Sequence, residues 1–243
     1  PTVYVIISSK TSGYTYSTAG NPIQLNTSNN WKGTWDNLRK YYITDENEAI
    51  EIEYEVIETA IDGATLEGNE FLKYDSRLGL IGKWTNEVTG NTEDGFIVTN
   101  TWTESPKIQL KFIKVSFLSD DIKLPNATFV LYRYIGDTNV LHDNLIDLST
   151  IDTNTWVLID EITSTSTGEV DFGNLYEGEY RLIETIAPAG YVLPKGQWII
   201  NIIPNENSVN DNDKLKIKFD GIELSTQPGI KDLGNGKYLI PNK

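Results

Sequence analysis

Short runs of alternating apolar and polar residues recur along the whole chain, separated by turns rich in Gly, Asn and Asp. The runs are rich in Val, Ile, Thr, Tyr and Trp, which favour strands, and no segment keeps a helical period for long. The clearest runs cover residues 2–8, 51–59, 94–102, 108–115, 127–134, 156–162, 198–204 and 215–224. This pattern predicts an all-β chain made of antiparallel β-sandwiches.

Three pairs of short motifs indicate an internal repeat. They are "YEVIETA" (54–60) with "YRLIETI" (180–186), "WDNL" (35–38) with "FGNL" (172–175), and "FIVTN" (96–100) with "YLIPN" (238–242). Because the three pairs occur in the same order, the simplest interpretation is two copies of one β unit. We therefore expect two tandem Ig-like domains, over residues 1–104 and 105–243, with residues 101–107 as the linker.

Polar residues stand on the apolar faces of several predicted strands. Side chains alternate between the two faces of a strand, so every second residue shares a face. Counting in this way places five polar residues at the ends of apolar stripes, namely Glu58, Asn100, Lys114, Glu184 and Asn242. For any one strand, the simpler explanation is that the strand ends there and the residue emerges into solvent. That explanation is less satisfactory for the set, since these residues recur at matching places in the repeat.

A buried Lys, Glu and Asn can react with one another. Burying an unpaired charge costs several kcal/mol at least, so such groups must be paired, neutral or chemically consumed. Burial lowers the pKa of a Lys amine and raises that of a Glu carboxyl, which favours a neutral nucleophile and a protonated acid. The acid can then polarise the Asn carbonyl and carry protons while the amine displaces ammonia. The product is an amide bond between Lys and Asn.

The second copy resembles a known family. Its segments "IKVSFLSDDIKLPNATFVLYRY", "GEVDFGNLYEGEYRLIETIAPAGYVLP" and "YLIPNK" are similar to the collagen-adhesin B-type (CnaB) domains of Gram-positive pilins and surface adhesins. The resemblance covers residues 108–243 apart from an insertion at about 134–155, and its "ETxAPxGY" element is specific. It implies an intramolecular isopeptide bond, with Lys114 as nucleophile, Asn242 as electrophile and Glu184 as proton shuttle.

The first copy is similar to a variant of this family with a "WTxTWxNLPKY" signature, through "NNWKGTWDNLRKYY" and "DGFIVTNTW". The resemblance implies that Glu58 and Asn100 fill two of the three roles there. The reactive Lys of the family lies on a strand before the one resembling "PTVYVIIS", whereas Lys10 follows that strand in a polar turn. We therefore expect the first domain to lack its opening strand. Asn100 then stays unlinked, unless a neighbouring strand pairs with the exposed edge.

Composition excludes several classes of function. The net charge of −15 and the pI near 4.4 oppose binding to nucleic acid or to anionic lipid. No apolar run approaches a membrane span and no signal segment is present, so we expect no membrane insertion in this fragment. The chain lacks Cys, which excludes disulfides, and lacks Met, which suggests processing or excision. We expect no cofactor.

No metal site or hydrolase triad is expected either. His142 is the only His, and we expect it in a surface loop. The oxygen-rich stretches 205–213 and 147–156 lack the spacing of a calcium loop and are expected to be solvated turns. A Ser/His/Asp triad would need His142, and "GxSxG" is absent.

Three functions remain open. The first is a structural subunit of a cell-wall-anchored pilus or surface stalk, favoured as a minor (ancillary or basal) pilin because no "YPK"-type motif is present. The second is an adhesin whose loops, such as residues 11–22 or 134–155, contact a host cell surface or matrix protein. The third is an accessory β-sandwich of a secreted glycan-degrading enzyme, with exposed Trp stacking on sugar. The first implies an extracellular location, partners joined by sortase, and no enzymatic activity beyond single-turnover crosslinking.

Overall fold

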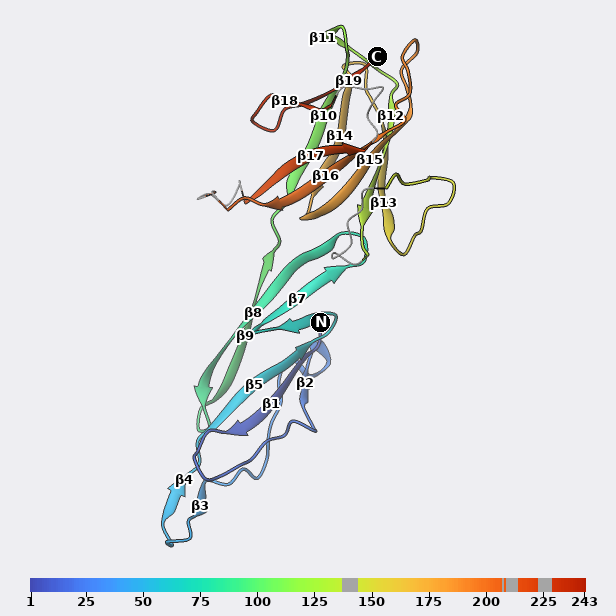
Figure 1. Ribbon diagram of the computed structural model, residues 1–243. Coiled ribbons are helices and arrows are strands. Elements are labelled where there is room, and N and C mark those ends of the chain that lie inside the picture. The colour runs from blue at the N-terminus through green and yellow to red at the C-terminus, as the bar shows by residue number, and fades with distance from the viewer. Residues whose placement is uncertain (137–143, 207, 209–213, 223–228) are drawn as a thin grey trace. The chain divides into compact units, whose positions relative to one another are not determined.

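The computed structural model describes residues 1–136, 144–206, 208, 214–222 and 229–243. Within these ranges the chain consists of strands and one short 3-10 helix, Thr27–Asn29, which confirms the predicted all-β class (Figure 1). Contacts divide the chain into two compact units. The first unit comprises residues 1–74 and 82–104, and the second comprises residues 75–81 and 105–243.

The strands of the first unit form three small sheets. In one sheet β1 lies between β2 and β5, and in another β6, β7, β8 and β9 follow one another, while β3 and β4 form a separate hairpin. Their bounds are β1 Val3–Ser9, β2 Ile23–Leu25, β3 Tyr41–Ile43, β4 Ala49–Glu51, β5 Tyr54–Ile61, β6 Thr65–Glu67, β7 Glu70–Asp75, β8 Gly79–Asn91 and β9 Gly95–Glu104.

The second unit has two five-stranded sheets. In one sheet the order is β13-β12-β15-β16-β17, and in the other it is β11-β10-β19-β18, with β14 also paired to β10. The bounds are β10 Ile108–Ser116, β11 Ser119–Lys123, β12 Thr128–Tyr134, β13 Trp156–Thr163, β14 Glu169–Leu175, β15 Gly178–Ile186, β16 Gln197–Pro204, β17 Leu215–Ile222, β18 Lys231–Asp232 and β19 Tyr238–Asn242.

The pairing of β10 with β19 is parallel, so two strands far apart in sequence run side by side. Every other strand pair described in the second unit is antiparallel. A parallel pair needs a long crossover connection, and here all the other strands of the unit supply it. The first and last strands of the unit, β10 and β19, are therefore neighbours in one sheet.

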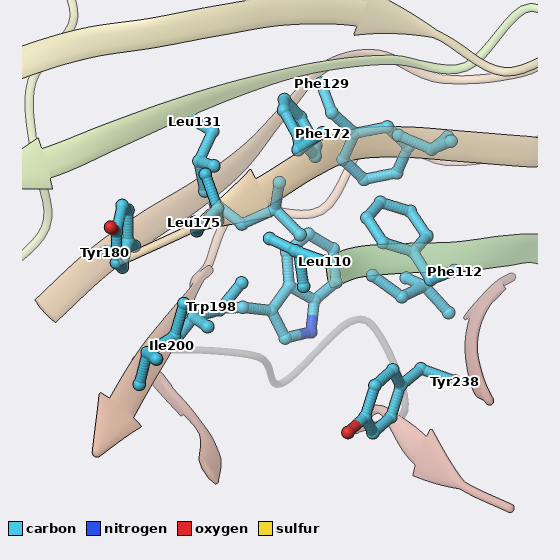
Figure 2. Close-up of a cluster of buried hydrophobic side chains, with 14 of the residues drawn as sticks. Leu110, Phe112, Phe129, Leu131, Phe172, Leu175, Tyr180, Trp198, Ile200 and Tyr238 are labelled. Atoms are coloured by element: carbon cyan, nitrogen blue, oxygen red, sulfur yellow. The ribbon is translucent and has the colours of Figure 1, made fainter. Parts of the chain in front are cut away.

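Aromatic and aliphatic side chains from both sheets fill the core of the second unit (Figure 2). Phe112 of β10 packs edge-on against Phe129 of β12, with ring centroids 5.0 Å apart, and Trp198 of β16 is almost fully buried beside them. Each such side chain contributes about 1.5–3 kcal/mol through burial. This packing fixes the inner faces of β10, β12 and β15, which also carry the polar residues of the predicted site.

The alternation predicted for residues 51–59 is confirmed. Ile52, Tyr54 and Val56 are buried together with Glu58, whereas Glu51 and Glu53 are exposed. The inward face of this strand therefore ends on a carboxylate, as the count of residues indicated.

Two other expectations about this region need correction. Residues 101–104 are not linker but the end of β9, because they pair with residues 82–85 of β8. The sequence pattern also missed β8 itself, since its glycines and scattered polar residues obscure the alternation.

His142, which we expected in a surface loop, lies outside the described residues.

Gly168, in the turn between β13 and β14, lies close to the backbone of β10, and a substitution there tests this close approach. It has a φ of +74°, and an added Cβ would collide with the backbone oxygen of Lys114. Gly173 has a similar φ of +71° but open space around it. Gly173→Ala should cost about 1–2 kcal/mol of unfolding free energy from backbone strain alone. Gly168→Ala should cost clearly more in urea unfolding, and equal losses would contradict the close approach to β10.

Candidate functional site

Three polar side chains meet inside the second unit: Lys114 from β10, Glu184 from β15 and Asn242 from β19. The Lys114 Nζ donates to Glu184 Oε2 at 2.7 Å, and the Asn242 Nδ2 donates to Glu184 Oε1 at 3.2 Å. Their exposed fractions are 0%, 2% and 0% respectively. The structure thus brings the three predicted residues of this unit into contact through one carboxylate.

Strand register places these side chains. In the parallel ladder Lys114 lies opposite Ile240 and Ser116 lies opposite Asn242, so the amine and the amide are separated by two positions on adjacent strands. Both residues follow the inward parity of their strands and are directed into the core.

A β-bulge positions the carboxylate in each unit. Glu184 lies opposite Phe129, next to a register shift between Thr128 and Phe129. Glu58 lies opposite Val5, next to a register shift between Tyr4 and Val5. Bulges redirect side chains and increase local twist. The same irregularity beside both glutamates supports the internal repeat from geometry rather than sequence.

Apolar surroundings govern the ionisation of the second-unit pair. The Lys114 Nζ lies 5.2 Å from the ring centroid of Phe129 and 5.9 Å from that of Trp198. Burial lowers the pKa of the Lys114 amine, and the Glu184 carboxylate only partly opposes this. Burial likewise raises the pKa of Glu184, against the effects of Lys114 and Asn242. Both shifts favour a neutral amine beside a protonated acid.

The amide of Asn242 has one unsatisfied atom. Its Oδ1 is buried without a hydrogen-bond partner among the described residues. Rotating the amide by half a turn exchanges Oδ1 and Nδ2, and a protonated Glu184 could then donate to the carbonyl oxygen. In that arrangement the acid polarises the carbonyl carbon next to the Lys114 amine.

The first unit contains a related pair without an amine. The Asn100 Nδ2 donates to Glu58 Oε2 at 3.0 Å, and the Asn86 Nδ2 reaches the same oxygen at 3.4 Å. Glu58 is 6% exposed, and burial raises its pKa, while the hydrogen bonds from Asn100 and Asn86 oppose the shift. Lys10 is exposed beyond the far end of β1 and does not approach this pair.

Asn86 is a site residue that the sequence did not indicate. It lies directly opposite Asn100 in the β8–β9 ladder. No motif pointed to Asn86, and the alternation of residues did not reveal β8, the long strand that carries it.

The described residues contain no group of three or more His, Cys, Asp or Glu side chains placed to hold a metal ion. In the acidic stretch 147–156, Asp147 and Asp152 accept hydrogen bonds from their own turns. No helix in the described ranges is long and apolar enough to cross a membrane.

The fold and the site together define a class of β-sandwich domain in which one buried carboxylate accepts hydrogen bonds from a buried amine and a buried amide. Residues 108–216 match the family model SpaA, described as a prealbumin-like fold domain. The match confirms the resemblance of this part of the chain to pilin and surface-adhesin domains. A comparison with curated proteins gives no match.

The solved structures that this chain matches include pilus proteins. The C-terminal fragment of the pilus adhesin SpaC from Lactobacillus rhamnosus GG is 15% identical, with 99% of this chain and 87% of that chain covered and a TM-score of 0.41. Domains D2 and D3 of the major pilin SpaD from Corynebacterium diphtheriae are 14% identical, with 99% and 85% covered and a TM-score of 0.36. This chain spans 28% of the longer SpaC chain.

Ionisation of Glu58 should make the stability of the first unit depend on pH. Its pKa is raised above the ordinary value of 4.5, so the folded state favours the neutral acid. The stabilisation from Glu58 is complete below about pH 4.5 and is lost as pH rises through the raised pKa. The Gln side chain of Glu58→Gln cannot ionise. The free energy of unfolding of this variant should therefore increase relative to that of wild type between pH 5 and pH 8.

Urea unfolding followed by Trp fluorescence at both pH values would measure this difference. Glu53→Gln, a change at an exposed carboxylate near the start of the same strand, serves as the control and should show no such gain. Parallel pH profiles for wild type and Glu58→Gln would contradict a raised pKa.

Proposed function

We propose that this chain is a structural segment of a cell-wall-anchored pilus or surface stalk of a Gram-positive bacterium, stabilised by a self-made amide bond between Lys114 and Asn242. The observation that supports this most directly is the contact of the Lys114 amine and the Asn242 amide with opposite oxygens of Glu184, inside a core closed to water. The tandem domains over residues 1–104 and 105–243, and the extracellular location, are part of the same proposal.

The reaction needs only the three side chains. The neutral Lys114 amine attacks the Cγ of Asn242 while the protonated Glu184 donates to the carbonyl oxygen. Glu184 then carries the proton lost by the amine to the departing nitrogen, so a C–N bond forms and one ammonia leaves. Folding holds the reactants together, which supplies most of the acceleration. The reaction occurs once per chain, so the protein is not an enzyme in the ordinary sense.

The product suits a load-bearing role. The strands β10 and β19 are the first and last of the second unit and lie side by side, and the bond would join them directly. The chain has no Cys, so a disulfide cannot take this role. The bond would also convert the buried Lys114 amine into part of a neutral amide.

The proposal also includes the molecules to which this chain attaches. The similar solved structures include proteins described as pilus adhesins and a major pilin. On this basis we propose other pilus subunits, joined by sortase, as partners, with a contribution to attachment at a host cell surface or matrix protein. The place of the subunit as a minor pilin belongs to the same proposal.

The intact mass of the purified chain tests the bond. Wild type should be lighter than its sequence mass by one ammonia, because amide formation expels one. Lys114→Arg and Glu184→Gln should have their full sequence mass, since the first lacks the nucleophile and the second lacks the proton shuttle. Lys218→Arg, at an exposed position on β17, should keep the loss. A full mass for wild type would refute the crosslink.

Thermal unfolding tests what the bond contributes. It would close a loop of roughly 130 residues, which is worth about 4–5 kcal/mol if the crosslink acts by constraining the unfolded chain. The Tm of Glu184→Gln should therefore lie about 10–20 °C below that of wild type. Lys218→Arg should melt with wild type. An unchanged Tm in Glu184→Gln would show that the carboxylate has no part in a stabilising bond.

A further inference from the structure

Residues 144–155, which we call the cover segment, pack against the second unit's five-stranded sheet β13-β12-β15-β16-β17 on the face opposite the main core. The segment contributes to a second apolar cluster, separate from the main core, whose buried members are Val130, Tyr134, Ile146, Trp156 and Ile183. Ile151 of the same segment is partly buried against this cluster. The described part of the insertion is therefore fixed to its own domain.

Buried polar contacts hold the cover segment in one place. The Gln197 Oε1 accepts from the backbone N–H of Ile146 at 2.9 Å, and the Gln197 Nε2 donates to the Ile146 carbonyl oxygen at 2.6 Å. Arg181, which is fully buried, donates to the carbonyl oxygen of Asn144 at 3.0 Å and lies 5.1 Å from the ring centroid of Trp156. Because a buried polar group left without a partner costs about 1–3 kcal/mol, displacing the segment is unfavourable.

The cover segment lies on the outer side of the strands that enclose the crosslinking site. Adjacent residues of a strand point to opposite faces, so a residue of the site and a residue under the cover can be neighbours in sequence. Three such pairs occur, namely Phe129 and Val130 on β12, Glu184 and Ile183 on β15, and Trp198 and Gln197 on β16. The rings of Phe129 and Trp198 lie 5.2 Å and 5.9 Å from the Lys114 Nζ.

We propose that the cover segment positions the groups that form the Lys114–Asn242 amide, with Gln197 as the positioning residue that connects it to the site. It holds β12, β15 and β16 so that Glu184 and the two aromatic rings stay around the amine, and it keeps water from the outer side of these strands. This proposal rests on the crosslink proposed above, since it concerns the rate of that reaction. A displacement of about 1 Å can slow a reaction by about a hundredfold, so small movements of these strands matter.

The rate of ammonia loss tests the proposal. The full chain is collected in urea after brief cell-free synthesis, refolded by dilution, and followed by native mass spectrometry, which separates folded from unfolded chains by charge state. Gln197→Met keeps the length of the side chain but loses both hydrogen bonds to Ile146. It should slow ammonia loss from the folded chain by about tenfold or more. Leu148→Ala, at a 41% exposed position of the same segment, should react at the wild-type rate.

The pH profile of this rate separates positioning from stability. Burial raises the pKa of Glu184 and lowers that of Lys114. Water admitted by Gln197→Met would move both pKa values back toward their ordinary values. The bend that Glu184 produces in the rate profile should therefore move to lower pH, and the bend that Lys114 produces should move to higher pH. A cover segment that only stabilised the domain would leave both bends of the folded chain in place, and that result would overturn the proposal.

A milder variant keeps the test decisive if Gln197→Met does not fold. Ile146→Val removes one methylene from the cluster, which typically costs about 0.5–1.5 kcal/mol, and it should still slow ammonia loss from the folded chain. Wild-type rates in both variants, or in Ile146→Val where it alone folds, would overturn the positioning role and leave the crosslink itself in place. A wild-type chain that keeps its full sequence mass would overturn both proposals.

Discussion

The carboxylate of Glu184 is shared by an amine and an amide in a core that water does not reach. Removing an ion from water costs several kcal/mol even after relaxation, while a whole domain is stable by only about 5–15 kcal/mol. A permanently charged Lys114–Glu184 pair would therefore consume much of the stability that the surrounding aromatic core supplies. In the proposed reaction, proton transfer from the amine and formation of the amide would remove that cost.

Topology decides when the chemistry can occur. Lys114 and Asn242 lie on β10 and β19, the first and last strands of the second unit, which pair although the rest of the unit separates them along the chain. Such long-range pairing forms late, because loop-closure entropy must be overcome first. We therefore expect the amine to reach the amide late in folding, when most of the sandwich has formed.

The period of two along each strand was enough to predict the inward direction of Lys114, Glu184 and Asn242, because the strands carrying them are regular up to the site. The same count failed for β8, where glycines interrupt the pattern, and so it missed Asn86. The bulges beside Glu58 and Glu184 were also unpredicted, since a bulge leaves no signal in the alternation of a single strand.

The two units make a comparison within one chain. In the second unit each oxygen of the glutamate receives one donor, the amine on Oε2 and the amide on Oε1. In the first unit two amides crowd onto Oε2 of Glu58, while Oε1 is left bare. Asn86 thus supplies the hydrogen bond that a lysine supplies elsewhere, but it brings neither a nucleophile nor a positive charge. The hydrogen bonds from these two amides only partly oppose the effect of burial, so the pKa of Glu58 remains raised.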